Sequence, residues 1–228
     1  MQIINPDNIG DFHVHSSTFS DGFNSIDEIV IAAGKLEYQK IAITDHSQDL
    51  LDAYGMTRKT HYDIISSGRW ENIHNEVEVT FGVEADLLNE KGDICNHIQG
   101  HKPDFVILSA HKKVYSGELD KIKLAYLSAI EKYGKRINLL GHFCNKQITN
   151  FLENKDIIEI VKLANSHEIA FEINCANLVY GKTDLEKLKL MLDNARLIYV
   201  NSDAHTMNEL LNIRKEGFDY IKTILNNH

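Results

Sequence analysis

The sequence predicts an α/β fold in which seven parallel strands alternate with helices. Short runs rich in Ile, Val, Phe and Leu alternate along the chain with amphipathic stretches, a pattern typical of βα units. Polar residues at the ends of these runs recur at intervals of 27 to 38 residues. The 228 residues correspond to just over seven units of about 31 residues, the unit length of a barrel with eight units in about 250 residues. Because no linker or low-complexity segment divides the chain, we expect one domain over residues 1–228.

Seven apolar runs are the predicted strands. They are Ile9–Val14, Lys40–Thr44, Glu78–Val83, Phe105–Ser109, Ile137–Leu140, Ile169–Ile173 and Leu197–Asn201. In a parallel βα barrel the carboxyl ends of all strands lie at one face, where the active site is built. The residues that follow these runs are therefore expected to converge.

The segments between the strands carry helix signals. Ser25-Ile26-Asp27-Glu28 has the pattern of a capping box, and Thr183-Asp184-Leu185-Glu186 has the same form. Apolar side chains at three- and four-residue spacing predict helices that pack on the sheet. These stripes are Ile26, Ile29, Val30 and Ala33; Leu119, Ile122, Ala125, Tyr126, Ala129, Ile130 and Tyr133; and Ile157, Ile160, Val161 and Ala164. Residues 50–75 are less regular and predict either a partly helical lid or a long βα connection.

Six of the twelve histidines lie at the ends of predicted strands. His13-Val14-His15 places two imidazoles on one face of a strand, because strand side chains alternate with a period of two. The other strand-end candidates are His46, His111, His142, His205, Asp21, Glu84 and Asp203. Imidazoles and carboxylates without thiolates favour Zn, Mn or Fe over a sulfur-rich structural zinc site. The sequence therefore predicts a metal site at the carboxyl ends of the strands.

Composition limits the partners and the location. Lys and Arg number 24 and Asp and Glu number 33, and the formal charge of −9 disfavours nucleic acid as a partner. No apolar run of about 18 residues suggests a membrane span, and the N-terminus lacks a signal-peptide pattern. Cys95, Cys144 and Cys175 have no C-x-x-C spacing and are typical of free thiols in a reducing compartment. We expect a cytoplasmic protein that does not bind membranes.

A set of motifs resembles the polymerase and histidinol phosphatase (PHP) superfamily. The motifs are His13-Val14-His15-Ser16, Ser20-Asp21-Gly22, Ile43-Thr44-Asp45-His46-Ser47, Gly82-Val83-Glu84, His111, Gly141-His142 and Ser202-Asp203-Ala204-His205. The likeness covers almost the whole chain and is greatest to the PHP domain of bacterial X-family DNA polymerases and to related stand-alone phosphatases. It implies a distorted (β/α)7 TIM-like barrel with a trinuclear metal centre at the C-terminal ends of the strands.

The resemblance also implies three groups of metal ligands. The first group is His13, His15, Glu84 and Asp203. Glu84 would bridge to a second ion that His111 and His142 also bind. The third group is Asp21, His46 and His205. The implied cofactors are three divalent ions, which can be Zn, Mn or Fe.

The metals predict the reaction. Two cations about 3.5–4 Å apart can hold a bridging hydroxide and aim it at phosphorus while they neutralise the phosphoryl oxygens. We expect a metal-dependent phosphoric ester hydrolase, with Glu84, Asp203 and His205 as the catalytic residues. The favoured activity is a histidinol-phosphatase-like hydrolysis of a small phosphomonoester. The alternatives are a PHP-type 3′-5′ exonuclease or DNA 3′-end-processing phosphodiesterase, and a non-catalytic metal-binding interaction module.

Other polar residues near the motifs are weaker candidates. Asp45 could accept a hydrogen bond from the His46 imidazole and fix its tautomer, or it could form an Asx-type turn at the strand end. Residues close in sequence to the ligands, or in the predicted lid, could contact the substrate phosphate. These candidates are Arg58, His61, Lys112, Lys113, Asn145, Lys146 and Asn174. For Asn174, and for Glu172 on the same strand, a hydrogen bond inside the barrel is an equal alternative.

Overall fold

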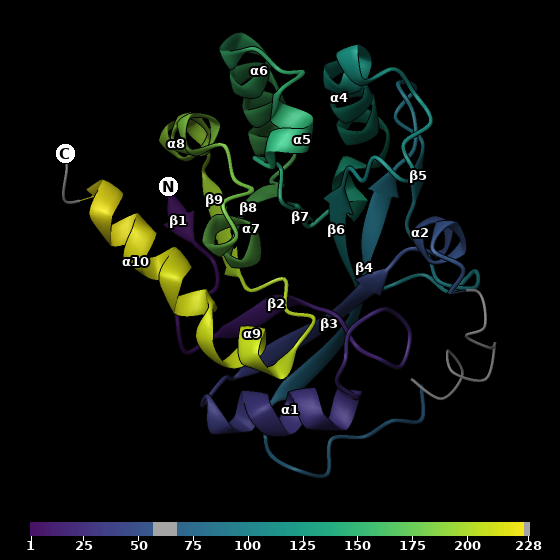
Figure 1. Cartoon of the computed structure of the whole chain (residues 1–228), viewed down its shortest axis with the longest axis vertical. Coiled ribbons are helices and arrows are strands. Elements are labelled where there is room, and N and C mark those ends of the chain that lie inside the picture. The colour runs from purple at the N-terminus through teal and green to yellow at the C-terminus, as the bar shows by residue number, and fades with distance from the viewer. Residues whose placement is uncertain (57–67, 226–228) are drawn as a thin grey trace.

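The computed structural model describes residues 1–56 and 68–225, and its strands form one curved sheet (Figure 1). The strand order is β1-β9-β8-β7-β6-β4-β3-β2, with parallel pairing throughout, and β5 pairs antiparallel with β4. The strands are β1 (Gln2–Ile3), β2 (Gly10–Val14), β3 (Lys40–His46), β4 (Glu78–Leu87), β5 (Ile94–Cys95), β6 (Phe105–Ser109), β7 (Leu139–Leu140), β8 (Ala170–Asn174) and β9 (Leu197–Asn201). The predicted parallel α/β architecture is confirmed.

All seven predicted strands are present, with differences at their ends. β6 and β9 have the predicted bounds, whereas β4 continues beyond Val83 to Leu87 and β7 is reduced to Leu139–Leu140. β1 and β5 were not predicted, because runs of two residues show no periodicity. β1 extends the sheet beside β9, and β5 covers the end of β4.

Helices cover the outer face of the sheet. They are α1 (Ile26–Lys35), α2 (Gln48–Ala53), α4 (Ile122–Tyr133), α5 (Lys146–Thr149), α6 (Asn154–Ser166), α7 (Cys175–Val179), α8 (Leu185–Asn194), α9 (Met207–Asn212) and α10 (Arg214–Leu225), with 3-10 turns η1 (Leu119–Lys121) and η2 (Gly134–Arg136). α1 packs against β3 and α9, α6 lies between α4 and α8, and α10 packs against α7 and β9 (Figure 1). Among the described helices, none combines the length and the apolar character needed to cross a membrane.

The predicted helix signals are correct in one case and displaced in the other. Ser25 and Glu28 form the capping box at the start of α1. In α8, Asp184 rather than Thr183 is the N-cap, because its side chain accepts a hydrogen bond from the backbone N–H of Lys187. Of the predicted lid or connection over residues 50–75, part belongs to α2, and residues 57–67 lie outside the described residues.

The inside of the barrel has an apolar layer and a polar layer. Side chains of Phe12, Phe105 and Tyr199 meet there with ring centroids 5.2–5.8 Å apart. Small and aliphatic side chains pack with them: Ala42, Ile107, Leu139, Ala170 and Leu197. On β8 and β9 the inward positions become polar two residues further along the strand, in the steps from Ala170 to Glu172 and from Tyr199 to Asn201. The polar layer therefore lies on the carboxyl side of the aromatic layer, where the sequence predicts the site.

Side chains complete the barrel between β2 and β9. Val14 and Ala204 form an isolated parallel bridge, and the β2 register is irregular between Asp11 and Val14. The Asn5 amide nitrogen donates to the carbonyls of Gly10 and Val200 and to the Asn201 side chain, each at 3.0 Å. These contacts replace part of a strand ladder, which explains why the barrel is distorted.

Arg214 at the start of α10 fixes the same seam. Its guanidinium is 2% exposed and donates to the carbonyl oxygens of Val200, Asp7 and Asn5 at 2.8, 2.8 and 2.6 Å. It also lies about 5 Å from the ring centroids of Tyr38 and Phe218. Among the described basic side chains, Arg214 alone is buried with several carbonyl partners, which its planar fork of N–H groups can reach together.

We expect Arg214→Lys to lower the free energy of unfolding by about 2–4 kcal/mol, because an ammonium group leaves some of these buried carbonyls unpaired. Urea unfolding followed by circular dichroism measures the change. Arg196→Lys at an exposed position is the matched control. Equal stability of the two variants would contradict a role for Arg214 in joining α10 to the barrel.

Candidate metal centre

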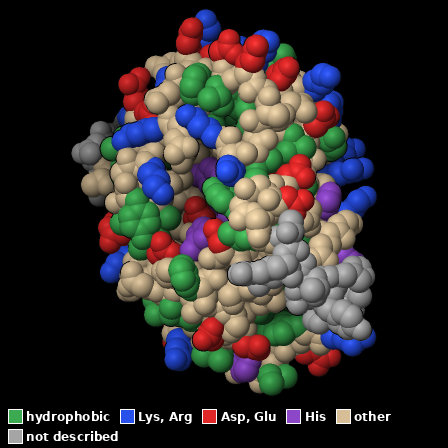
Figure 2. Space-filling view, turned by 45° about the vertical axis from the view of Figure 1, so that its right-hand side comes forward, with side chains coloured by type: hydrophobic (Ala, Val, Ile, Leu, Met, Phe, Trp, Pro, Cys, Tyr) green, Lys and Arg blue, Asp and Glu red, His purple; other side chains and the backbone are tan. Residues whose placement is uncertain are grey.

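The carboxyl ends of the strands bring the nine predicted side chains together. His13 lies on β2, His46 on β3 and Glu84 on β4, and the others follow strands or lie in the loop after β2. Those others are His15, Asp21, His111, His142, Asp203 and His205. Figure 2 shows histidine side chains inside a hollow of the surface, with acidic side chains beside them. Residues up to 192 positions apart in the chain (His13 to His205) thus form one cluster.

Glu84 lies at the centre of the cluster and is 1% exposed. Its two oxygens lie within 3.6 Å of five imidazoles. The distances are 3.5 Å to His13 Nε2, 3.6 Å to His15 Nε2, 2.8 Å to His46 Nδ1, 3.5 Å to His111 Nε2 and 2.8 Å to His142 Nε2. One carboxylate therefore connects ligands from four strands, as the predicted bridging position requires.

Two further carboxylates extend the cluster toward solvent. Asp203 Oδ1 lies 3.5 Å from His13 Nε2 and 3.2 Å from His15 Nε2. Asp21 Oδ1 lies 3.3 Å from the Nε2 atoms of both His46 and His205. These contacts join members of the first and third predicted groups. His15 also lies within reach of the third group, so the groups adjoin one another.

The arrangement of lone pairs fits divalent cations. Metal–ligand bonds of 2.0–2.2 Å place neighbouring ligand atoms roughly 3.0–3.6 Å apart, and most of the N···O distances above fall in this range. Several buried polar atoms in the described structure have no hydrogen-bond partner, although buried polar groups normally do. They include His13 Nε2, both ring nitrogens of His15, His46 Nδ1 and Glu84 Oε2. Atoms of this kind that point at one another are the donor set of a metal site.

Burial and charge shift the pKa values within the cluster. Burial, helped by the imidazoles of His205 and His46, lowers the pKa of His15 to about 3. Burial also opposes the charged form of His205, but the carboxylates of Asp21 and Asp203 outweigh it and raise its pKa to about 9. The His imidazoles around Glu84 overcome its burial and hold its pKa well below the usual value. Ionised carboxylates thus surround imidazoles that cannot all carry a proton.

Two candidate ligands have a left-handed backbone. The φ angles are +28° at His142 and +56° at Asp203, a region that costs a non-glycine residue roughly 1–3 kcal/mol. Strain of this kind collects at functional sites, where the surrounding structure enforces it. Here the conformation turns each side chain from the end of a strand toward the cluster.

Two carboxylates outside the predicted ligand groups hold the candidate ligands in place, and for Glu172 this is the predicted alternative of a hydrogen bond inside the barrel. Glu172 Oε1 lies 2.8 Å from His13 Nδ1, and its Oε2 accepts a hydrogen bond from the His142 backbone N–H at 2.8 Å. Asp86 Oδ1 lies 2.7 Å from His111 Nδ1, and its Oδ2 accepts from the Ser47 hydroxyl. A carboxylate on the second ring nitrogen fixes the tautomer of a ligating histidine. The two-residue period of a strand could have predicted both contacts, because it places Asp86 on the same face as Glu84 and Glu172 on the same face as Asn174.

Asp45, for which the sequence left open a contact with the His46 imidazole or an Asx-type turn, contacts Ser16 instead. Its carboxylate oxygens accept hydrogen bonds from the backbone N–H and the hydroxyl of Ser16, both at 2.6 Å. Consecutive residues on a strand point to opposite faces, so Asp45 faces outward where His46 faces inward. Asp45 orders the loop that carries Asp21, and burial raises its pKa to about 7.

The predicted substrate contacts have three outcomes. Lys112, Lys113 and Asn145 line a cavity of about 430 Å³ beside His111 and His142. Lys146 and Asn174 have other partners. The Lys146 ammonium donates to the Gly181 carbonyl, and the Asn174 amide donates to Glu172 and Asp203, so Asn174 positions the acidic residues. Arg58 and His61 lie outside the described residues.

Comparison with known proteins decides the family. The model of the PHP domain matches residues 11–176, which include seven of the nine clustered side chains and most of the barrel. The chain belongs to the PHP domain family. This confirms the resemblance that the motifs indicated. Asp203 and His205 lie beyond the matched range, and the structure brings them to the same cluster.

Curated PHP relatives include enzymes of two kinds. The chain is 26% identical over 213 residues to the probable phosphatase PMI1003 of Proteus mirabilis, covering 90% of this chain and 82% of the relative. It is 23% identical over 202 residues to the probable phosphatase YcdX of Escherichia fergusonii, covering 86% and 78%. It is 29% identical over 232 residues to the DNA polymerase/3′-5′ exonuclease PolX of Bacillus subtilis, covering 95% of this chain but 39% of PolX.

Solved structures share the PHP fold. The putative histidinol phosphatase hisK of Listeria monocytogenes superposes with a TM-score of 0.61 at 16% identity, covering 90% of this chain and 98% of that one. The histidinol phosphate phosphatase of Lactococcus lactis, solved with zinc, L-histidinol and phosphate, gives a TM-score of 0.53 at 16% identity, covering 95% and 94%. These similarities confirm the predicted distorted TIM-like barrel.

Divalent cations should stabilise the protein, because they bind the clustered lone pairs in the folded state only. A cation at about 100 times its Kd adds about 2.7 kcal/mol per site, or roughly 5–10 °C in Tm for a domain of this size. Scanning calorimetry of chelator-treated protein with added Mn²⁺, Zn²⁺ or Fe²⁺ measures the shift. If none of these ions raises the Tm, the cluster does not bind metal.

Glu172→Gln should weaken cation binding about 10- to 100-fold, because His13 loses the carboxylate that orients its ring. Titration with Mn²⁺ or Zn²⁺ in a calorimeter gives the affinity. Glu71→Gln, at an exposed position, removes the same charge from the surface. An unchanged affinity in Glu172→Gln would show that His13 does not depend on Glu172.

Proposed function

We propose that this protein is a metal-dependent phosphatase that hydrolyses small phosphomonoesters. The observation that carries the proposal is the buried cluster around Glu84, in which ring nitrogens of His13, His15 and His46 and one Glu84 oxygen lack hydrogen-bond partners. Membership of the PHP family and the similarity to two probable phosphatases support the same reaction. The cluster supplies the cation ligands that phosphate ester hydrolysis requires.

Bound divalent cations would lower the pKa of water and neutralise charge on the phosphoryl oxygens. The residues of this chain then have distinct tasks. Glu84 holds the imidazoles of four strands in one place, and Glu172 and Asp86 fix the rings of His13 and His111. We propose that three ions bind to the predicted ligand groups. Zn, Mn and Fe suit this donor set equally.

We propose Glu84, Asp203 and His205 as the catalytic residues, Glu84 as the central ligand of the cations and the other two closer to the substrate. Asp203 Oδ2 accepts a hydrogen bond from the Asn174 amide, which leaves Oδ1 aimed at His13 and His15. The His205 side chain is 29% exposed, whereas His13 and His15 are completely buried. His205 therefore lies at the entrance, where it can meet a substrate as it arrives.

The alternatives have weaker support. The similarity to PolX covers 39% of that protein, so it says little about the activity of PolX as a whole. The formal charge of −9 disfavours a nucleic acid substrate. A non-catalytic module would have no physical reason to keep nine ligand-type side chains and the carboxylates that orient them. A phosphatase accounts for the nine ligand-type side chains and for the carboxylates that orient them.

The cysteines support the cytoplasmic location that we propose. Cys95, Cys144 and Cys175 are free and buried. Unpaired thiols are typical of a reducing compartment.

Purified protein reconstituted with Mn²⁺ or Zn²⁺ should release phosphate from small phosphomonoesters. The panel also contains a phosphodiester reporter and 3′-labelled single-stranded DNA. Glu84→Gln keeps the side-chain volume but removes the central charge, and we expect at least about a 100-fold lower turnover with an unchanged circular dichroism spectrum. Phosphate release is measured colorimetrically.

Hydrolysis of DNA alone would replace the phosphatase with a nuclease. No hydrolysis of any substrate after reconstitution would favour the non-catalytic module. Full turnover in Glu84→Gln would show that the reaction takes place elsewhere in the molecule.

A further inference from the structure

The cavity next to the candidate metal centre has the size of a small-molecule pocket. Its volume of about 430 Å³ lies in the usual range for such pockets. The lining residues are Tyr54, Ala110, His111, Lys112, Lys113, His142, Asn145, Gln147 and Ile148. Because His111 and His142 belong to both the cavity and the cluster, a phosphomonoester bound at the cluster would place its alcohol portion here.

The charge of this cavity differs from that of the chain. The protein has nine more acidic than basic residues, and the adjoining cluster contains Asp21, Glu84 and Asp203. Among the described residues that line the cavity, two are lysines and none is acidic. The phosphoryl group would bind at the cluster, so it does not account for the two lysines of the cavity.

The two lysines lie on an ordered turn that starts at a candidate ligand. The backbone N–H groups of Val114 and Tyr115 donate to the His111 carbonyl at 3.0 and 2.9 Å, and Tyr115 is buried. Lys112 and Lys113 are therefore fixed in the chain relative to the His111 imidazole. The turn therefore keeps the two positive charges near the phosphate that would react at the cluster.

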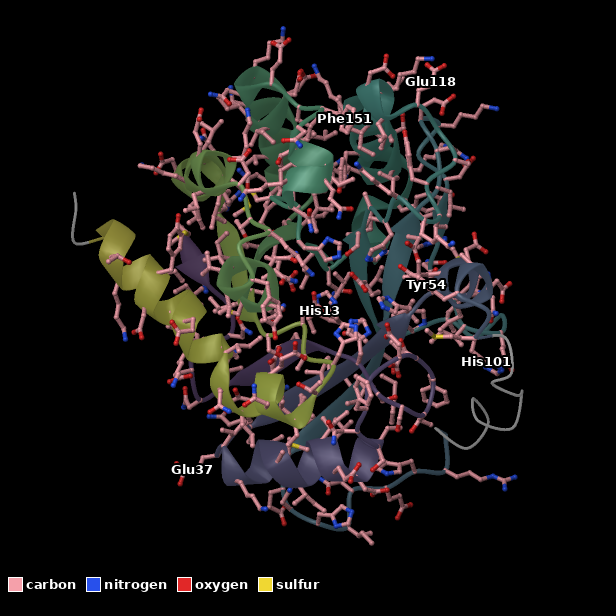
Figure 3. All side chains as sticks on the ribbon, viewed as in Figure 1. His13, Glu37, Tyr54, His101, Glu118 and Phe151 are labelled. Carbon is pink, nitrogen blue, oxygen red and sulfur yellow. The ribbon has the colours of Figure 1, made fainter. Side chains whose placement is uncertain are left out.

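Aromatic rings hold both ammonium groups. Lys112 Nζ lies 5.4 Å from the ring centroid of Phe151, and Lys113 Nζ lies 5.8 Å from that of Tyr54. Figure 3 shows Phe151 near α5 and Tyr54 near α2. A ring face attracts a cation without neutralising it. Both charges thus remain available to an anion.

We propose that the preferred substrate is a small phosphomonoester with a second anionic group, and that Lys112 and Lys113 bind that group. The second group is a carboxylate or another phosphate, since both are oxyanions that an ammonium attracts. Asn145 and Gln147 offer amide donors beside the lysines, and Ala110 and Ile148 offer apolar contact to the carbon chain. This inference rests on the proposed phosphatase function.

Matched pairs of substrates test the inference. 3-Phosphoglycerate and glycerol 3-phosphate differ only in a carboxylate, and glycerol 1,3-bisphosphate adds a second phosphate instead. We expect the Mn²⁺-loaded enzyme to give a kcat/KM at least about fivefold higher for the substrates with a second anion, mainly through KM. A comparison of kcat/KM for 3-phosphoglycerate and glycerol 1,3-bisphosphate shows whether the second group is a carboxylate or a phosphate.

Variants assign the preference to the lysines. Lys112→Gln and Lys113→Gln keep a polar side chain and should each reduce the preference roughly 3- to 10-fold, the effect of removing one exposed charge contact. Lys113→Glu should reverse the preference. Lys162→Gln on α6 removes the same charge far from the cavity and should retain the preference.

The outcomes separate this inference from the proposed function. Equal kcat/KM for the substrates with and without a second anionic group overturns the inference and leaves the phosphatase intact. A preference that survives in Lys112→Gln and Lys113→Gln does the same. No hydrolysis of any of these esters overturns the phosphatase itself. A short DNA with a 3′-phosphate as the best substrate would assign the lysines to a nucleic acid backbone and also overturn the inference.

Discussion

The buried carboxylate of Glu84 is the interaction on which the site depends. An ionised carboxylate is costly to bury unless opposite charge or hydrogen-bond donors surround it. Five imidazoles from four βα units meet this requirement, and each can do so only if its strand has the correct register. The pairing of β3, β4 and β6 therefore serves stability and site geometry together. Glu172 and Asp86 bind the second ring nitrogens of His13 and His111, so each of these imidazoles lies between two carboxylates.

Most of the site could be predicted because it follows from position along strands. A strand fixes which face a side chain occupies, and a parallel barrel fixes which end of each strand meets the others. His13, Glu84 and His111 needed no more than these two rules. The same rule, applied to neighbours, would have excluded a contact from Asp45 to His46 and would have suggested Glu172 for His13.

The remaining features depend on contacts that leave no local pattern. Neither the closure between β2 and β9 by Asn5 nor the buried Arg214 follows any periodicity, because both join segments about 195 or more residues apart. The turn of Lys146 away from the cavity depends on the loop that contains Gly181. The adjacent residues Asn145 and Lys146 thus have different surroundings, since Asn145 lines the cavity and Lys146 contacts the loop of Gly181.

The aromatic layer formed by Phe12, Phe105 and Tyr199 fills the barrel beneath the site, and this has a kinetic consequence. The cluster is therefore open to solvent on the carboxyl side of the strands, at the cavity beside His111 and His142 and at the partly exposed Asp21 and His205. In the substrate pose proposed above, the alcohol would lie in the cavity and the phosphate deeper, at the cluster. The alcohol would then leave first, and inorganic phosphate would act as a competitive product inhibitor.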